Sequence, residues 1–306
     1  MLEIISTCPR TNTNSLEFEE LCKKFNYKFI EIFPKNQGFN SSEMKNILSN
    51  TEICIIGDDE VDKDVLIQSK KLKHIIKWGT GIDNIDLDFA NENNIEVHNT
   101  PNILGKYVAE YTLGLIIDNL RNISNNNSNM KNKIWDKSSG ISLYEKTIGF
   151  YGFGDIGKNL AKLLRPFGCE VIYTDLKNMS LKDTEYVEFE KLIEKSQILI
   201  ISAPLTEDTY KIINKQNLKN NNSLELLVNI SRGGLVDENE IFDLVLSQNI
   251  KRLSLDVYEN EPPLIKDSIL DNEKFLFTSH NASNTIDANY EINSKILHIL
   301  DEILGE

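Results

Sequence analysis

Three side chains of complementary chemistry each follow a strand that the sequence predicts. They are Arg232 in NISRGGLVDE, Glu261 in SLDVYENEPP and His280 in FTSHNAS. The carboxyl ends of parallel strands share one edge of a sheet, so we expect these side chains to converge there. A guanidinium can hold and polarise a ketone, an imidazolium can protonate the developing alkoxide, and a neighbouring carboxylate fixes the tautomer of the imidazole. The combination suits hydride transfer to a carbonyl carbon.

Each of the three also fits a structural role when it is considered alone. An arginine after a strand often forms a surface ion pair, a glutamate before two prolines often only keeps a loop soluble, and a lone histidine often caps a turn. Glu259 is a competing carboxylate in the same segment as Glu261. His74, His98 and His298 lack a comparable context, and we interpret them as structural.

A glycine-rich turn would bring the hydride carrier to these groups. Residues 147–175 are predicted to form a strand, a turn, a helix and a second strand. The turn has G-x-G-x-x-G spacing, formed by Gly152, Gly154 and Gly157. The first glycine permits the tight turn, the second lets the backbone approach a pyrophosphate, and the third lets helix and strand pack. We expect the pyrophosphate to bind N–H groups at the start of the helix, including those of Asp155 and Ile156.

Asp175 ends the second strand of this unit, where its carboxylate can accept hydrogen bonds from a ribose diol. It would repel a 2′-phosphate, so we expect NAD in preference to NADP, although Lys177 nearby leaves this choice open. The alternative is a tight turn between strand and helix that binds no ligand.

The composition excludes several other classes of protein. The chain has 306 residues, 40% of them apolar and 26% charged, which suits two globular domains. A formal net charge of −14 argues against nucleic acid or an anionic membrane as a partner. No apolar run approaches the roughly 18 residues of a membrane-spanning helix, and the start resembles no signal peptide, so we expect a cytoplasmic protein. The four cysteines form no C-x-x-C pair, and we predict no metal.

Short apolar runs alternate with helical spacers along the chain. Runs at 2–5, 27–32, 53–56, 74–78 and 95–99 predict a first parallel α/β domain, and six more from residue 148 to residue 278 predict a doubly wound sheet. We expect a helix over 104–120 and an amphipathic helix over 287–303 that packs back onto the first domain. The substrate domain would then comprise 1–101 and 284–306, the nucleotide domain 102–283, with a cleft between them.

Several motifs resemble, in order, those of the D-isomer-specific 2-hydroxyacid dehydrogenase family. They are KWGTGIDNID, VHNTPN, VAEYTLGL, PLTEDT, ISRGGLVDE, LDVYENEPP and the segment around His280. The resemblance covers nearly the whole chain and is to the short, phosphoglycerate dehydrogenase-like form without a regulatory domain. It implies a Rossmann nucleotide-binding domain and a smaller, flavodoxin-like α/β domain.

Carried over residue by residue, the resemblance implies that Arg232 binds the substrate carboxylate and carbonyl, His280 donates the proton and Glu261 orients it. Asp256 would bind the nicotinamide carboxamide. The implied substrate-binding residues are Lys77, Gly79, Thr80, Gly81 and Arg232, with backbone N–H groups of 79–81 on the carboxylate. The implied cofactor-binding residues are Thr80, Gly152, Gly154, Asp155, Ile156, Gly157, Asp175, Ala203, Pro204, Thr209, Ile230, Ser231, Asp256 and Ser283.

The chain departs from the family pattern at Ser279, where proline is common, and at two places with more bearing on the ligands. Many relatives have histidine at the position of Ser202. Relatives that handle 3-phosphoglycerate carry an arginine after the third strand, where this chain has Asp58 and Asp59, which would repel a phosphate. Lys77 and Lys137 keep a second anionic group on the substrate open.

The sequence therefore predicts an NAD-dependent oxidoreductase that acts on a small D-isomer 2-oxo or 2-hydroxy acid. Two alternatives remain. One is an NAD(H)-sensing regulatory protein similar to the C-terminal binding protein corepressors, and the other is a phosphite-type dehydrogenase, since both keep the arginine, glutamate and histidine. We also expect a homodimer, formed by the helix over 104–120 and the Asn-rich segment after it, as in the family.

Overall fold

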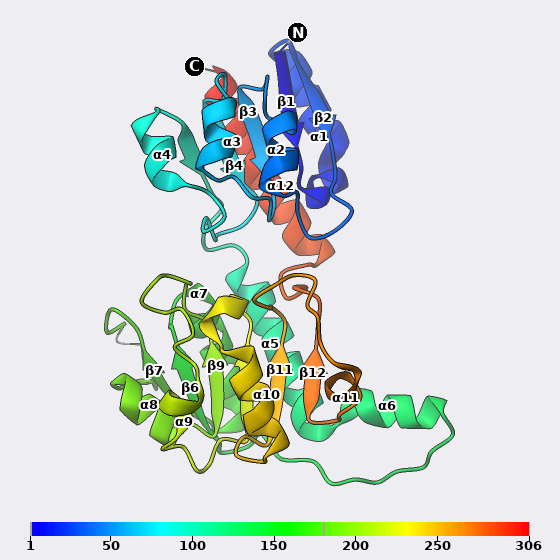
Figure 1. The fold of residues 1–306 in the computed structure, drawn as a ribbon, viewed down its shortest axis with the longest axis vertical. Helices are drawn as coiled ribbons and strands as arrows, with labels where there is room; N and C mark the ends of the chain where they lie inside the picture. The colour runs from blue at the N-terminus through cyan, green and yellow to red at the C-terminus, as the bar shows by residue number, and fades with distance from the viewer. Residues whose placement is uncertain (1, 180, 306) are drawn as a thin grey trace. The chain divides into compact units, whose positions relative to one another are not determined.

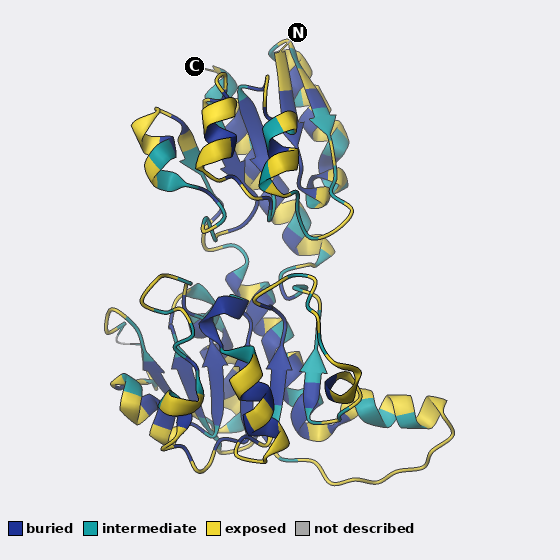
Figure 2. Cartoon of the chain, in the orientation of Figure 1, coloured by how far each residue is buried: buried dark blue, intermediate teal, exposed yellow. Residues whose placement is uncertain are grey.

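The chain forms two compact units in the computed structural model, which describes residues 2–179 and 181–305 (Figure 1). Unit 1 comprises Met1–Leu104 and Asn284–Glu306, and unit 2 comprises Gly105–Ser283. Each unit is a parallel sheet with helices on both faces. Figure 2 shows that the strands of each sheet are largely buried, whereas the covering helices expose their outer faces.

Unit 1 has a five-stranded sheet in the order β2-β1-β3-β4-β5. The strands are β1 Leu2–Ser6, β2 Tyr27–Glu31, β3 Ile53–Ile56, β4 His74–Lys77 and β5 Glu96–His98. Every residue of β3 is buried, because a central strand of a parallel sheet is covered on both faces. The order is that of flavodoxin-like folds, in which the chain reverses its direction of growth between β1 and β3.

Two groups of helices cover the faces of this sheet. On one face α1 (Ser15–Lys24) and α12 (Ile286–Gly305) pack on alternate strand residues that include Ile55 and Ile76. On the other face α2 (Ser41–Ile47) and α3 (Lys63–Gln68) pack on a second apolar cluster. The remaining elements are η1 Pro9–Asn14 and α4 Leu87–Glu92. The C-terminal helix therefore belongs to the core of unit 1.

Unit 2 has a seven-stranded sheet in the order β12-β11-β10-β9-β6-β7-β8. The strands are β6 Thr147–Tyr151, β7 Glu170–Thr174, β8 Glu185–Tyr186, β9 Ile198–Ile201, β10 Leu226–Asn229, β11 Arg252–Leu255 and β12 Phe275–Phe277. This is the Rossmann order, and its switch point lies between β6 and β9. The expectation of six strands was wrong by one, because β8 is a two-residue edge strand with no apolar run to mark it.

The helices of unit 2 differ in how far they are buried. α5 (Gly105–Arg121) packs on α7 (Asp155–Leu164), whereas α6 (Ile123–Lys131) buries none of its residues and extends away from the sheet (Figure 1). The other elements are η2 Arg165–Phe167, α8 Phe189–Lys195, α9 Lys215–Leu218, η3 Gly233–Leu235, α10 Glu238–Leu246 and α11 Asp267–Leu270. Among the residues described, none of the helices is long and apolar enough to cross a membrane.

Candidate active site

The glycine turn after β6 has the geometry that its spacing predicts. Gly152 has φ +86°, and a Cβ there would lie 2.5 Å from the backbone N of Ala203. Ser202 donates a hydrogen bond of 2.7 Å from Oγ to the carbonyl of Gly152. A Cβ on Gly157 would lie 2.9 Å from the ring of Phe153. The first glycine therefore serves the turn, the third serves packing, and Ser202 braces the turn.

The start of α7 offers room and N–H groups for a pyrophosphate. Gly154 is the N-cap of α7, and no side chain caps the N–H groups of the first turn. A Cβ on Gly154 would have no heavy atom within 4 Å. The first recorded backbone bond of the helix runs from Lys158 N to Gly154 O, at 3.0 Å. The N–H groups of Asp155 and Ile156 precede it and have no partner within the helix. Open space beside such groups fits the pyrophosphate of a dinucleotide.

Two carboxylates frame this turn. Asp155 accepts a 3.1 Å hydrogen bond from the N–H of Gly105, so its side chain ties α7 to the start of α5 and only its backbone remains for a phosphate. Asp175 lies at the end of β7 and accepts a 2.6 Å hydrogen bond at Oδ2 from the N–H of Phe153. This bond holds Asp175 against the glycine turn. A carboxylate at the end of this strand is the group that binds the ribose diol in dinucleotide-binding units.

His280 and Glu261 form a direct pair in unit 2. The imidazole Nδ1 lies 2.8 Å from Glu261 Oε2, and Glu261 Oε1 accepts a 3.0 Å hydrogen bond from the N–H of Tyr258. The His280 and Glu261 side chains are 23% and 20% exposed, so the pair is held in place but accessible. With Nδ1 directed at the carboxylate, Nε2 is the nitrogen that can exchange a proton with a substrate.

Asp256 holds the loop that carries His280. It is fully buried, and its carboxylate accepts hydrogen bonds from Thr278 Oγ1 at 2.6 Å, Asn281 N at 2.9 Å and Ala282 N at 2.9 Å. Its carbonyl oxygen accepts a 2.6 Å bond from the N–H of His280, whose φ is +48°. These contacts fix an unusual backbone conformation, so Asp256 is at least a positioning residue for His280.

The competing carboxylate, Glu259, lies elsewhere. It accepts a 2.7 Å hydrogen bond from the hydroxyl of Tyr210 and lies 3.4 Å from the ammonium of Lys211. Its backbone N–H donates to Glu238 at 2.6 Å, and burial, together with the charge of Glu259, raises the pKa of Glu238. The structure thus distinguishes the two carboxylates of ENEPP, and Glu261 is the one beside the imidazole.

Arg232 follows β10 at the same carboxyl edge of the sheet in unit 2. Its Nη1 donates to the carbonyl of Ser231 at 2.9 Å, and its own carbonyl accepts a 2.9 Å bond from the side chain of Asn229. Ser231 Oγ in turn donates to the carbonyl of Ala203. The loops after β9 and β10 are therefore joined beside the glycine turn. Four further residues assigned to the cofactor lie in loops of this edge, Pro204, Thr209, Ile230 and Ser283, whereas Thr80 lies in unit 1.

The loop assigned to the substrate carboxylate, in unit 1, differs from its prediction at one residue. The N–H of Gly79 donates to Thr100 Oγ1 at 3.0 Å, and the carbonyl of Gly79 accepts from Thr100 N at 2.9 Å. This N–H is thus occupied within unit 1. For Thr80 and Gly81 no bond of the backbone N–H is recorded in the described part of the chain. Only these two N–H groups of the loop are available to an anion.

Lys77 is also engaged within unit 1. Its side chain is 3% exposed, and its ammonium donates to the carbonyl of Gly57 and to Asp58, the latter at 3.1 Å. Asp59 is buried and accepts hydrogen bonds from Thr7 Oγ1 at 2.5 Å and from the N–H of Gly57 at 3.0 Å. The ammonium braces the loop from within, and neither acid stands as an uncompensated charge on the surface.

Arg10 is a cation that the sequence reasoning did not single out. It follows β1, next to the switch point between β1 and β3, and its guanidinium lies 4.6 Å from the ring centroid of Trp78. No ion pair of Arg10 is recorded among residues 2–179 and 181–305. Trp78 directly precedes the loop of Gly79 to Gly81. The rule that ligands bind at the switch point of an open sheet would have found this residue once the strand order was known.

Comparisons with known proteins agree with this arrangement. The model of the NAD-binding domain of D-isomer specific 2-hydroxyacid dehydrogenases matches residues 113–282. Hydroxypyruvate reductase of Thermotoga maritima is 31% identical over 281 residues, which are 90% of this chain and 92% of that protein. D-3-phosphoglycerate dehydrogenase of Methanocaldococcus jannaschii is 30% identical over 87% of this chain, and the match spans 52% of the relative.

A solved structure of D-lactate dehydrogenase from Aquifex aeolicus, complexed with NAD and lactic acid, matches 99% of this chain and 95% of its own. The TM-score is 0.86 at 22% identity, which shows a shared fold. The family model covers more than half of the chain, and the first relative matches along most of both sequences. The chain therefore belongs to the family of D-isomer specific 2-hydroxyacid dehydrogenases, oxidoreductases with an NAD-binding domain.

Proposed function

We propose that this protein is an NADH-dependent reductase of a small 2-oxo acid, with Arg232, Glu261 and His280 as its catalytic residues. The observation that carries the proposal is the pair of His280 and Glu261, whose ring nitrogen and carboxylate oxygen are 2.8 Å apart. A carboxylate that is itself held by a backbone N–H fixes the tautomer and orientation of the imidazole, as a proton donor requires. The open helix start beside Gly154, in the same unit, supports the assignment of the cofactor.

The residues divide the chemistry between them. Bound NADH would supply the hydride to the carbonyl carbon. Arg232 would hold the substrate carboxylate and polarise the carbonyl oxygen, since a guanidinium offers several donors in one plane. His280 would give a proton from Nε2 to that oxygen, while Glu261 stabilises the ring in its protonated form through Nδ1. Asp256 would keep the His280 loop in place; because it is fully buried and its carboxylate already holds three donors, the cofactor contact that the family resemblance implied for it is not supported.

Unit 1 would supply the remaining substrate contacts. The N–H groups of Thr80 and Gly81 would be the donors for the substrate carboxylate. Lys77 braces this loop from within. Arg10 would bind the substituent on the substrate carbon next to the carbonyl. It is a cation beside Trp78, which precedes the loop of Thr80 and Gly81, and no ion pair of Arg10 is recorded among the described residues. We therefore favour a substrate with a polar or anionic substituent, in agreement with relatives named hydroxypyruvate reductase and D-3-phosphoglycerate dehydrogenase.

The test is NADH oxidation against a panel of 2-oxo acids. The panel contains glyoxylate, pyruvate, hydroxypyruvate, 3-phosphohydroxypyruvate and phosphonopyruvate, so that it varies only the substituent. We expect hydroxypyruvate or a phosphorylated acid to have the highest kcat/KM, and Arg10→Gln to reduce that preference toward the value for glyoxylate. Bound NADH without turnover of any acid would contradict the proposed reaction.

We also propose a homodimer in which α6 and the segment after it cover part of a second copy. α6 buries none of its residues within the chain, yet four large apolar side chains there are more than half exposed. They are Ile123, Met130, Ile134 and Trp135. Exposed apolar side chains that gather on one projecting element mark an interaction surface. Light scattering during size-exclusion chromatography should give twice the 35.0 kDa chain mass, and Trp135→Asp should weaken that dimer.

A further inference from the structure

Three of the side chains in unit 1 meet at one edge of its sheet, one from β4 and two from β5. His74 begins β4, and Glu96 and His98 begin and end β5, the edge strand. The two strands pair in parallel, with His74 opposite Glu96 and Ile76 opposite His98. Paired residues and those two positions apart share one face of a sheet, so all three side chains project from the same face. Ile76 shows that this is the face covered by α12.

The ligand atoms of these three residues form a nearly equilateral triangle. His74 Nδ1 lies 3.4 Å from His98 Nε2 and 3.7 Å from Glu96 Oε2, and His98 Nε2 lies 3.6 Å from the same carboxylate oxygen. A circle through the three atoms has a radius of about 2.1 Å, close to the Zn–N and Zn–O bond lengths of about 2.0–2.2 Å. A metal ion fits at this point after movements of a few tenths of an ångström.

We propose that His74, Glu96 and His98 bind one divalent transition-metal ion of the zinc class. Two imidazoles and a carboxylate suit Zn²⁺, Ni²⁺, Co²⁺ or Cu²⁺, and they do not suit Mg²⁺, which prefers oxygen ligands. The fourth position would be taken by water, since the side chains of His74 and His98 are 19% and 28% exposed and that of Glu96 is 68% exposed. An ion can therefore enter from solvent.

Two carboxylates act electrostatically on His98, that of Glu96 on β5 and that of Glu302 on α12. The two carboxylates offset the positive charge of a bound ion.

The other strong metal ligands of the chain compete poorly. Burial raises the pKa of the Cys8 thiol to about 11 and that of Cys22 to about 12, and it also raises those of Cys54 and Cys169. Thiols in this state give up a proton reluctantly, and only the thiolate binds metal well. Two histidine–glutamate pairs, His280 with Glu261 and His298 with Glu302, each offer two ligand residues where the proposed site offers three.

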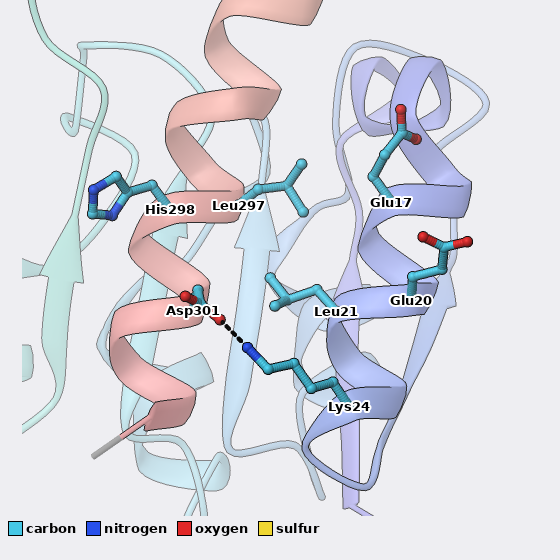
Figure 3. A pocket seen from close by; sticks show the side chains of 7 residues that line it. All are labelled: Glu17, Glu20, Leu21, Lys24, Leu297, His298 and Asp301. Carbon is cyan, nitrogen blue, oxygen red and sulfur yellow. Dashed lines mark hydrogen bonds and ion pairs between the residues drawn. The ribbon is translucent and has the colours of Figure 1, made fainter.

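His298 provides a matched control. It lies on α12, forms an ion pair with Glu302 at 3.3 Å and borders a shallow groove between α1 and α12. In Figure 3 its ring points away from α1 and from the Lys24–Asp301 ion pair that crosses this groove. It is an exposed histidine of the same unit that stands outside the ligand triangle.

The test uses the full chain without a histidine tag, freed of metal by a chelator and titrated with Zn²⁺ against a chromogenic chelating indicator. We expect one Zn²⁺ per chain with micromolar affinity, and no response to Mg²⁺. His74→Gln and His98→Gln should each weaken Zn²⁺ binding by at least about 10-fold to 100-fold, which is the range for a metal site that loses a supporting group. His298→Gln should bind as tightly as the parent.

A second readout does not depend on the indicator. Zn²⁺ should raise the midpoint temperature of unfolding of the parent and of His298→Gln, because an ion that binds only the folded state stabilises it. Zn²⁺ should leave the midpoint temperature of the double variant His74→Gln/His98→Gln unchanged. The circular dichroism spectra of the metal-free variants should match that of the parent. Three results would each overturn the proposal. They are stoichiometric binding that survives in the double variant, loss of binding in His280→Gln instead, and no stoichiometric binding in the parent.

Discussion

Two alanine substitutions in the glycine turn should have opposite effects on stability and on cofactor binding. In Gly152→Ala the new Cβ would lie 2.5 Å from the backbone N of Ala203, at a residue with φ +86°. The positive φ costs about 1–3 kcal/mol, and overpacking against an immobile backbone costs about 1–3 kcal/mol more. We therefore expect unit 2 to lose about 2–6 kcal/mol of its free energy of unfolding.

Gly154→Ala should leave the fold nearly intact, because its Cβ meets no heavy atom within 4 Å. Alanine is a poorer N-cap than glycine, which costs at most about 1–2 kcal/mol. The same Cβ would occupy the space assigned to the pyrophosphate. Loss of one charge-assisted N–H bond to a phosphate costs about 1.5–3 kcal/mol, so the Kd for NADH should rise about 10-fold to 150-fold.

The assays are urea unfolding without cofactor, followed by circular dichroism, and titration of NADH fluorescence with each folded variant. The expected pattern is a destabilised Gly152→Ala and a stable Gly154→Ala that binds NADH weakly. If Gly154→Ala bound NADH as tightly as the parent, the pyrophosphate would not lie over the start of α7, and the reasoning from the empty space beside that residue would be refuted.

Three further substitutions test other parts of the account. Glu261→Gln should lower kcat by about 10²-fold to 10⁴-fold, the range for general acid–base groups, whereas Glu259→Gln should change it little. Arg10→Gln should raise KM for the preferred acid and leave the Kd for NADH unchanged, as steady-state kinetics and fluorescence titration would show. Burial opposes ionisation of Glu225, but its ion pairs with Lys146 and Lys251 outweigh burial and lower the pKa of Glu225 below its ordinary value. Above the ordinary pKa of a glutamate, ionised Glu225 therefore stabilises the fold, and this stabilisation is lost as pH falls through the lowered pKa. Glu225→Gln should lower the free energy of unfolding by about 1–2 kcal/mol at pH 7 and leave it unchanged in acid, as urea unfolding at each pH would show.

The fold was largely predictable because parallel strands that are buried on both faces consist of short runs of apolar residues. β3 is four apolar residues in a row, and the structure assigns the predicted bounds to it. β8 could not be found in this way, because two residues at a sheet edge need neither apolar character nor length. The glycine turn was predictable because its G-x-G-x-x-G spacing lies within one short strand–turn–helix segment, although the backbone that Gly152 must clear is that of Ala203.

The parts that the sequence did not reveal depend on strand order and register. The acceptor of the Gly79 N–H is Thr100, and the partner of Lys77 is Asp58, pairs that only the folded sheet brings together. The same holds for His74 and His98, which were interpreted as separate structural histidines. Their convergence follows from the register of β4 on β5, which no motif records.

The central claim is that His280, held by its carboxylate, delivers the proton in an NADH-dependent reduction. The most direct test is single-turnover oxidation of bound NADH by the preferred 2-oxo acid, in the parent and in His280→Asn, with NADH affinity measured in both. The account predicts rapid oxidation in the parent, a rate at least about 10²-fold lower in His280→Asn, and the same Kd for NADH. Equal rates in the two proteins would contradict it.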